Sequence, residues 1–255
     1  MKFYQFLEKD FARQNVDFSE FHNSADWVEK RILEEYGALF AARGAARVPS
    51  QIIFKNEREV SAFQKSVSIA KKNIGGFELE LQTAAMYDLL KSIAEAEVND
   101  LTITPRGADS ARRNYAQTVE LWASRVVPAL AHWTKKGKLT VNEAEDMLAL
   151  APFEQVPIIL ELEEKGVYFS KDLSKSIVYS VAPPGTSQHL AMLAFDVAEY
   201  KNERVREILA RRGWFQTVVS DLPHFTYLGA DENELPDLGL KKVENCGQTF
   251  WIPNI

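Results

Sequence analysis

Apolar residues recur at three- and four-residue steps along much of this chain, which is the spacing of helices that bury one face. The clearest example lies between residues 25 and 42, with apolar positions at Val28, Ile32, Tyr36, Leu39 and Phe40. The same spacing predicts helices over residues 57–71, 78–98, 110–132, 155–165 and 202–213. A further helix is expected from residue 141, because Thr140 and Glu143 have the spacing of a capping box.

Shorter runs of β-branched and apolar residues between these helical stretches predict strands. They occupy residues 49–54, 101–104, 176–181 and 194–197, and a closing hairpin is expected around residues 245–247. Helices and strands are thus mixed along the chain without a regular alternation. We therefore expect an α+β fold, in which helices pack on one face of a small, mostly antiparallel sheet.

The paired glycines Gly75 and Gly76 mark the expected division of the chain, since paired glycines interrupt regular structure. Residues 1–76 are interpreted as a mainly helical N-terminal extension and residues 77–255 as the main domain. The extension either covers the main domain or helps to shape a substrate cleft. Residues from about 134 to 172 exceed what a minimal fold needs, so we interpret them as a helical insertion.

Composition and charge narrow the class of protein. Hydrophobic residues make up 46% of the 255 residues and charged residues 26%, as in ordinary globular proteins. The net charge of −6 argues against nucleic-acid binding, which normally uses a basic face. The single cysteine, Cys246, excludes an intramolecular disulfide and a cysteine-based zinc site.

No run of residues approaches the roughly eighteen apolar residues of a membrane span. The charged beginning of the chain also lacks the apolar run of a signal peptide. The chain is therefore either cytoplasmic or a form from which an export signal has been removed, and the sequence leaves both readings open.

Two of the four histidines are accompanied by carboxylates at short offsets: His189 by Asp196, and His224 by Asp221. Two imidazoles and one carboxylate supply three protein ligands to Zn²⁺ and leave a fourth position for water, as in catalytic zinc sites. The second carboxylate is then free for proton transfer. The other two histidines, at positions 22 and 132, lie away from these motifs and are interpreted as structural or surface residues.

Residues 187–196 follow the pattern Ser-x-His-x-x-x-x-Ala-x-Asp, and residues 221–225 follow the pattern acidic-x-x-His-aromatic. Together they resemble the zinc D-alanyl-D-alanine carboxypeptidases and dipeptidases of the VanY and VanX kind, whose wider group includes the lysostaphin-type peptidases and the hedgehog signalling domain. The resemblance covers roughly residues 78–255. It departs from the family pattern at Met192, where the family usually has Gly, and at Asp221, where it usually has Glu.

The resemblance implies a role for each of these side chains. His189, Asp196 and His224 would bind Zn²⁺ on the open face of the sheet. Asp221 would act as the catalytic base, although it is one methylene shorter than the usual Glu. Ser187 would support the site or bind substrate.

The resemblance also implies an arginine that binds the terminal carboxylate of the substrate, which a guanidinium does through two parallel charge-assisted hydrogen bonds. Arg106 occupies the comparable place just after an expected strand. Arg112 and Arg113 compete for the role, because the family's arginine is followed closely by a glutamine and Gln117 lies nearer to them.

The function implied by the resemblance is that of a zinc-dependent D-alanyl-D-alanine carboxypeptidase, acting on peptidoglycan stem peptides of the bacterial cell wall through a metal-activated water. Two alternatives stay open: a catalytically weak or silent zinc-containing binding module, and a cell-wall endopeptidase or amidase. The expected partner is the peptidoglycan peptide, and nothing predicts nucleic acid or a protein partner. A location in the cell envelope or periplasm follows only if an export signal was removed.

Overall fold

The computed structural model describes residues 1–13, 17–23 and 25–255, so residues 14–16 and 24 of the expected N-terminal extension lie outside the described residues. The chain divides into two compact units. The first comprises residues 1–52, 61–113 and 188–255, and the second comprises residues 53–60 and 114–187. Each unit is built from segments that are distant in the sequence.

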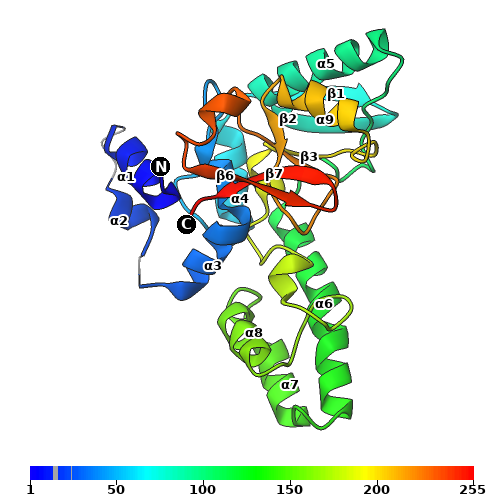
Figure 1. Ribbon diagram of the computed structural model, residues 1–255. Helices are drawn as coiled ribbons and strands as arrows, with labels where there is room; N and C mark the ends of the chain where they lie inside the picture. Colours follow the sequence, from blue (N-terminus) through cyan, green and yellow to red (C-terminus); the bar gives the residue numbers. More distant parts are fainter. Residues whose placement is uncertain (14–16, 24) are drawn as a thin grey trace. The chain divides into compact units, whose positions relative to one another are not determined.

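The first unit contains both helices and strands (Figure 1). Its helices are α1 (Phe3–Arg13), α2 (Phe18–Phe21), α3 (Trp27–Tyr36), α5 (Thr83–Val98), α9 (Glu203–Ala210) and the later part of α4 (Glu57–Ser66). The first unit also contains three short 3₁₀ helices: η1 (Gly37–Ala41), η3 (Gln188–Ala191) and η4 (Glu232–Glu234).

The strands of the first unit form three separate antiparallel sheets. β1 (Ile69–Ile74) and β2 (Phe77–Gln82) form a hairpin. β3 (Ala194–Asp196), β5 (His224–Tyr227) and β4 (Trp214–Gln216) form a sheet in the order β3-β5-β4, and β6 (Leu240–Asn245) pairs with β7 (Gln248–Pro253). The fold is α+β, as expected, although the strands are divided among three small sheets instead of one.

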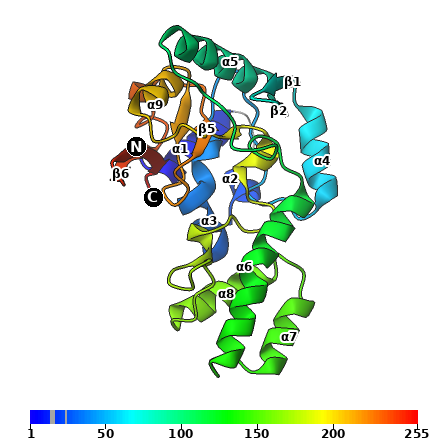
Figure 2. The ribbon, with the colours of Figure 1, turned by 90° about the vertical axis from the view of Figure 1, so that its right-hand side faces the viewer.

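A hydrophobic core cluster joins α5, α9, the β1–β2 hairpin and the central sheet of the first unit. Helix α5 contributes Ala85, Met86 and Leu89 from one face, and the central sheet contributes Phe195 and Trp214 among other aromatic residues. Figures 1 and 2 both show α5 beside α9. Because the sheet is small, its strands depend on these apolar contacts as much as on their own hydrogen bonds.

The second unit is mainly helical (Figure 2), with α6 (Tyr115–Lys135), α7 (Val141–Ala149), α8 (Gln155–Glu164) and the 3₁₀ helix η2 (Ile177–Tyr179). The predicted capping box is confirmed: the Thr140 hydroxyl accepts from the N–H of Glu143, and the Glu143 carboxylate accepts from the N–H of Thr140. The buried indole N–H of Trp122 donates to Gln155 at 2.9 Å, which joins α6 to α8. No helix in the described parts of the chain is long and apolar enough to cross a membrane.

Several other predicted elements are confirmed, and some are wrong. The expected helices near 155–165 and 202–213, the strand near 194–197 and the closing hairpin are all present. Residues 49–54 and 101–104 are irregular instead of extended strands, and residues 176–181 contain the 3₁₀ helix η2. A short apolar run indicates that a segment is buried, whatever its backbone conformation. A strand also requires a neighbouring strand with free hydrogen-bonding groups.

The expected helices over 57–71, 78–98 and 110–132 begin or end at other residues. Helix α4 ends at Ser66, and the hairpin of β1 and β2 occupies the next residues, while α6 begins only at Tyr115. In β2 the alternation of exposed Glu78 with buried Leu79 is the two-residue period of a strand. Leu81 belongs to β2, but it also fits the four-residue spacing of the apolar residues in α5. For this reason the helix predicted over 78–98 began too early in the sequence.

The division of the chain also differs from the expected one. Gly75 and Gly76 form the turn of the β1–β2 hairpin, and both sides of that turn belong to the first unit. The expected insertion over about 134–172 is only a part of the second unit. The longer segment of that unit runs from residue 114 to residue 187. Paired glycines therefore mark a tight turn within one unit here, because both have positive φ angles.

Gly213 lies in the turn between α9 and β4 with a φ of 76°, and an added Cβ atom would lie 2.8 Å from the Cα atom of Gly229. We expect Gly213→Ala to lower the free energy of unfolding by more than the roughly 1–2 kcal/mol of a left-handed residue alone, because backbone must also move. Gly247→Ala is the control, since its φ is 71° and nothing lies within 4 Å of the added atom. Urea unfolding of both variants measures the difference, and equal losses would contradict the close approach.

Candidate metal centre

The pairing of β3 with β5 places two of the predicted ligands side by side. In the antiparallel register Asp196 lies directly opposite His224. Side chains opposite each other on neighbouring strands point to the same face of the sheet, with Cβ atoms about 5 Å apart. Two residues separated by a long stretch of sequence thus meet at one end of the strand pair.

Pro223 immediately precedes His224. Its carbonyl oxygen accepts a hydrogen bond from the N–H of Val197 at 2.9 Å. Proline is tolerated there because it precedes the first residue of β5 and its missing N–H is not required by the ladder. His224 nevertheless begins the central strand of the sheet, a position that the sequence could not reveal.

His189 approaches the same carboxylate from η3. Its ring Nδ1 lies 2.6 Å from the carbonyl oxygen of Ala111, and its Nε2 lies 3.4 Å from Oδ1 of Asp196. A carbonyl oxygen can only accept a hydrogen bond, so Nδ1 carries the proton and Nε2 keeps its lone pair. The buried Nε2 atom has no hydrogen-bond partner within the described parts of the chain.

His224 is held in the opposite tautomer by Gln188. The amide nitrogen of Gln188 donates to the carbonyl oxygen of Tyr36 at 2.8 Å, which fixes the orientation of the amide. Its oxygen, Oε1, must then accept from Nε2 of His224 at 2.9 Å. The lone pair of His224 consequently lies on Nδ1, which is 3.3 Å from Oδ1 of Asp196.

These three residues could hold a metal ion. One ligand atom from each of His189, Asp196 and His224 lies within 4.8 Å of the others. Two imidazole lone pairs directed at one carboxylate oxygen repel it, and a bound cation would convert this repulsion into attraction. Hydrogen bonding of the outer ring nitrogen, as seen for both histidines, is the usual way in which proteins orient a metal-binding imidazole.

The protonation states of the group suit metal binding. Burial opposes ionisation of Asp196, but attraction to His189 and His224 in their protonated forms at low pH outweighs it, and the pKa of Asp196 lies well below its ordinary value. Burial, together with the positive charge of Arg113, lowers the pKa of His189. A carboxylate beside a neutral imidazole is the combination that a divalent cation requires.

Buried glutamines hold the segments around the group, a role that no pattern in the sequence predicted. Gln64 donates to the carbonyl oxygens of Arg113 and Leu190, and Gln82 donates to that of Ala191. Both glutamines are 2% exposed. Glutamine is usually a surface residue, so only the tertiary structure identifies these as positioning residues.

The three candidate arginines occupy different surroundings. Arg113 donates from Nη2 to Oδ2 of Asp196 at 3.1 Å, and its side chain is 16% exposed. Arg112 donates to Gln64 and forms an ion pair with Glu80, so its guanidinium is bound to these residues and not to the three candidate ligands. Arg106 is exposed, and its backbone N–H donates to the carbonyl oxygen of Asp196 at 3.2 Å. Arg113 is therefore the arginine whose side chain joins the ligand group.

Asp221 lies in the turn that leads to His224, whose backbone N–H donates to the carbonyl oxygen of Asp221 at 3.0 Å. The Asp221 side chain is exposed and does not belong to the three-residue group. Its charge nevertheless acts on the buried Tyr36. Burial raises the pKa of that phenol well above its ordinary value, and the carboxylates of Glu35 and Asp221 raise it further.

The remaining predicted site residues, Ser187 and Gln117, belong to the second unit. Ser187 is buried. Gln117 completes the capping box of α6, in which its side-chain oxygen accepts from the N–H of Asn114 at 2.8 Å. Their expected roles in substrate binding stay predictions.

Comparisons with known proteins leave the family of this chain open, because no protein-family model, curated protein or solved structure matches it. The geometry of the candidate metal centre is thus the main guide to function.

Replacing Gln188 by Met should weaken Zn²⁺ binding by about 10–100-fold, because His224 then loses the acceptor that fixes its tautomer. Competition of the protein with a chelating dye measures the affinity. Gln155→Met is the matched control, since Gln155 is also a buried hydrogen-bonding glutamine but lies in the second unit. Unchanged affinity in a folded Gln188→Met protein would contradict the role given to Gln188.

Proposed function

We propose that this protein is a zinc-dependent D-alanyl-D-alanine carboxypeptidase that acts on peptidoglycan stem peptides. The observation that carries the proposal is the pair of imidazole lone pairs, on Nε2 of His189 and Nδ1 of His224, that face the carboxylate of Asp196. Three protein ligands leave room for a water or substrate oxygen, as in catalytic zinc sites.

The backbone at Met192 adds support that is independent of the ligands. Met192 has a φ of 55°, in the left-handed region that favours glycine. The family that the motifs resemble usually has glycine at this position, in the turn between the first histidine and the aspartate. The N–H of Met192 donates to the carbonyl oxygen of His189 at 3.1 Å, which closes that turn. The chain thus preserves a backbone conformation that glycine would adopt more easily.

When bound by His189, Asp196 and His224, zinc supplies a Lewis acid that polarises a carbonyl group and lowers the pKa of a bound water to roughly 7. The protein's own contribution is to orient the ligands. Ala111 and Gln188 hold the two imidazoles, and Arg113 holds the second oxygen of Asp196.

Arg113 is the best candidate for binding the terminal carboxylate of a peptide. Its Nη2 donates to Asp196, and its side chain is 16% exposed, so part of it is accessible to a ligand. A guanidinium has five N–H donors, so it can bind one carboxylate while it orients another. Arg106 is the alternative, because its backbone is bonded to Asp196 and its side chain is exposed.

Asp221 is the proposed general base, and its exposed carboxylate can take up a proton from water and release it to a leaving amine. Its place three residues before His224 ties it to a ligand-bearing strand. The same exposure favours a second candidate function, a zinc-containing binding module without activity, since a base must come within hydrogen-bond reach of the water that it deprotonates.

The principal test measures zinc per chain together with D-alanine release from a pentapeptide that ends in D-Ala-D-Ala. We expect one zinc per chain and release of D-alanine by the wild type, and loss of both in His189→Ala, because a neutral imidazole ligand is removed. His132→Ala is the control, since His132 is only partly buried and belongs to the second unit, away from the three candidate ligands.

Zinc binding without D-alanine release would overturn the carboxypeptidase proposal and leave the binding module or a cell-wall endopeptidase or amidase. Asp221→Glu separates these outcomes, because the longer side chain would raise the activity of a weak enzyme and leave a silent module silent. Absence of zinc from the wild type would overturn the metal centre itself.

The choice between the two arginines gives a further prediction. Arg106→Lys should change KM little, whereas Arg113→Lys should raise KM for the peptide by about tenfold or more, because lysine cannot form two parallel hydrogen bonds with a carboxylate. Steady-state kinetics with zinc content measured for each variant tests this. The reverse order of effects, at full zinc content, would assign the substrate carboxylate to Arg106.

A further inference from the structure

Two buried threonines share a face of the small sheet with the candidate metal ligand His224. Thr226 lies two residues after His224 on β5, and side chains two residues apart on a strand point to the same face. Thr226 also lies opposite Phe215 of β4, and Thr217 lies two residues after Phe215 in the chain. Both threonines are 0% exposed, so their hydroxyl groups need partners within the protein.

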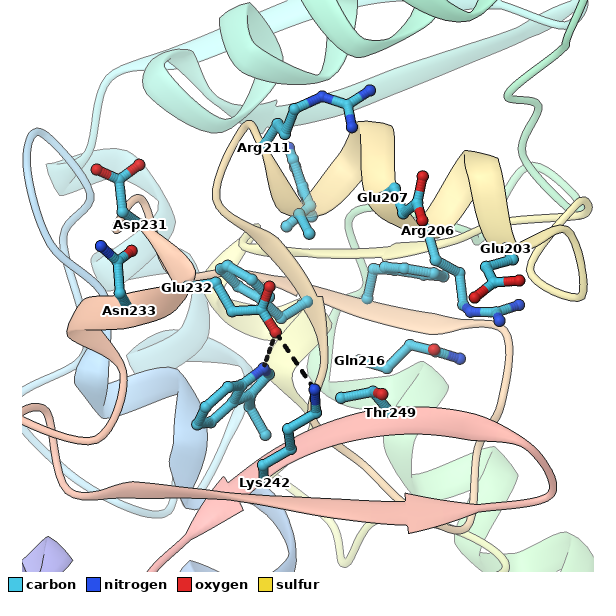
Figure 3. Close-up of a pocket in the computed structure, with 15 residues that line it drawn as sticks. Glu203, Arg206, Glu207, Arg211, Gln216, Asp231, Glu232, Asn233, Lys242 and Thr249 are labelled. Carbon is cyan, nitrogen blue, oxygen red and sulfur yellow. Dashed lines mark hydrogen bonds and ion pairs between the residues drawn. The ribbon is translucent and has the colours of Figure 1, made fainter.

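Gln216, the residue before Thr217, contacts a different part of the first unit. It lines a pocket of about 490 Å³ that is bordered by α9, η4 and the β6–β7 hairpin, and Figure 3 shows its side chain there. Successive residues of an extended chain point to opposite sides. Thr217 accordingly directs its hydroxyl to Thr226, with 2.6 Å between the two Oγ1 atoms, and belongs to the network around His224.

A closed ring of hydrogen bonds joins the two hydroxyl groups to the amide of Gln188. The Thr226 hydroxyl donates to Oε1 of Gln188. Because a hydroxyl has only one proton, the hydrogen bond between the two threonines requires Thr217 to donate and Thr226 to accept. The amide nitrogen Nε2 of Gln188 donates to the Thr217 hydroxyl over a longer distance of 3.5 Å, which closes the ring.

The carbonyl oxygen of Tyr36 gives this ring a single direction. It can only accept, and Nε2 of Gln188 donates to it at 2.8 Å. Rotation of the amide by half a turn would place Oε1 of Gln188 against this carbonyl oxygen and would leave both without a donor. Because the hydrogen bonds of the ring are buried, water cannot satisfy the groups that a reversal would leave unpaired.

The direction of the ring determines which nitrogen of His224 carries the proton. One lone pair of Oε1 of Gln188 accepts from Thr226, and the other faces Nε2 of His224 at 2.9 Å. Since Oε1 has no proton to give, Nε2 must carry one. The lone pair of the ring is then on Nδ1, which lies 3.3 Å from Oδ1 of Asp196 and would bind a metal ion.

We propose that Thr226 and Thr217 are positioning residues of the candidate metal centre, which act through Gln188 to hold His224 in the tautomer that binds a metal ion. The inference rests on the metal centre of the proposed function, although the tautomer itself can be measured without a metal. Thr217 also begins the connection between β4 and β5 that carries Asp221. The same bonds therefore set the place of the ligand and of the proposed base.

The first experiment follows the imidazole proton of His224 by NMR in the metal-free, full-length protein with ¹⁵N-labelled histidine. We expect the wild type to carry this proton on Nε2 and to exchange it slowly with water. Thr226→Val removes the hydroxyl and keeps the shape of the side chain, so exchange should become about tenfold faster or more. Thr226→Ser keeps the hydroxyl and should exchange as the wild type does.

Thr118→Val is the matched control and should leave the exchange unchanged. Thr118 is also buried, its hydroxyl also donates and accepts, and it lies in the second unit. A proton on Nδ1 of His224 in the wild type would overturn the proposal, and so would equal exchange in Thr226→Val and Thr226→Ser. None of these results requires zinc, so the failure of this proposal and the failure of the proposed function are distinguishable.

The second experiment measures zinc affinity by competition with a chelating dye. Thr226→Val should bind Zn²⁺ about tenfold more weakly than the wild type, because residues that orient a ligand typically contribute factors of at least this size. Thr217→Val opens the ring at another bond and should weaken binding as well. Wild-type affinity in folded Thr226→Val and Thr217→Val proteins would contradict the role given to the ring.

The double variant Thr226→Val with Gln188→Met tests whether Thr226 acts through Gln188. It should bind Zn²⁺ no more weakly than Gln188→Met alone, because the hydroxyl then has no amide to orient. Losses of affinity that add in the double variant would mean that Thr226 acts by another route, and would overturn the proposal.

Discussion

The antiparallel pairing of β3 with β5 is the constraint on which the candidate metal centre depends. It sets Asp196 opposite His224, and the loop that bonds to the outer edge of β3 also supplies Ala111, which orients His189. A shift of one residue in this register would turn every side chain of the strand to the other face. The hydrophobic contacts of Phe195 and Phe225 oppose such a shift, because both are buried in the core.

Irregular segments carry much of the site, and buried amides replace the regular hydrogen bonds that these segments lack. Gln64, Gln82 and Gln188 each join backbone or ring atoms from segments far apart in the sequence. An unsatisfied polar group in such a place costs about 1–3 kcal/mol, so each of these bonds favours one arrangement of the loops over its alternatives. The rigidity that metal ligands need is obtained in this way.

The sequence by itself determined the local features. The capping box of α7 and the closing hairpin were predicted, and so were the three residues that the structure brings together as a group able to hold a metal ion, because each prediction depends on short spacings or on residue types with few other uses. Only the tertiary structure decided which arginine joins the ligands, how the segments divide into two units, and which buried amides fix the imidazoles. These three features depend on contacts between residues far apart in the chain. Sequence spacing carries no information about such contacts, because they are set by which buried backbone groups form hydrogen bonds with each other in the folded protein.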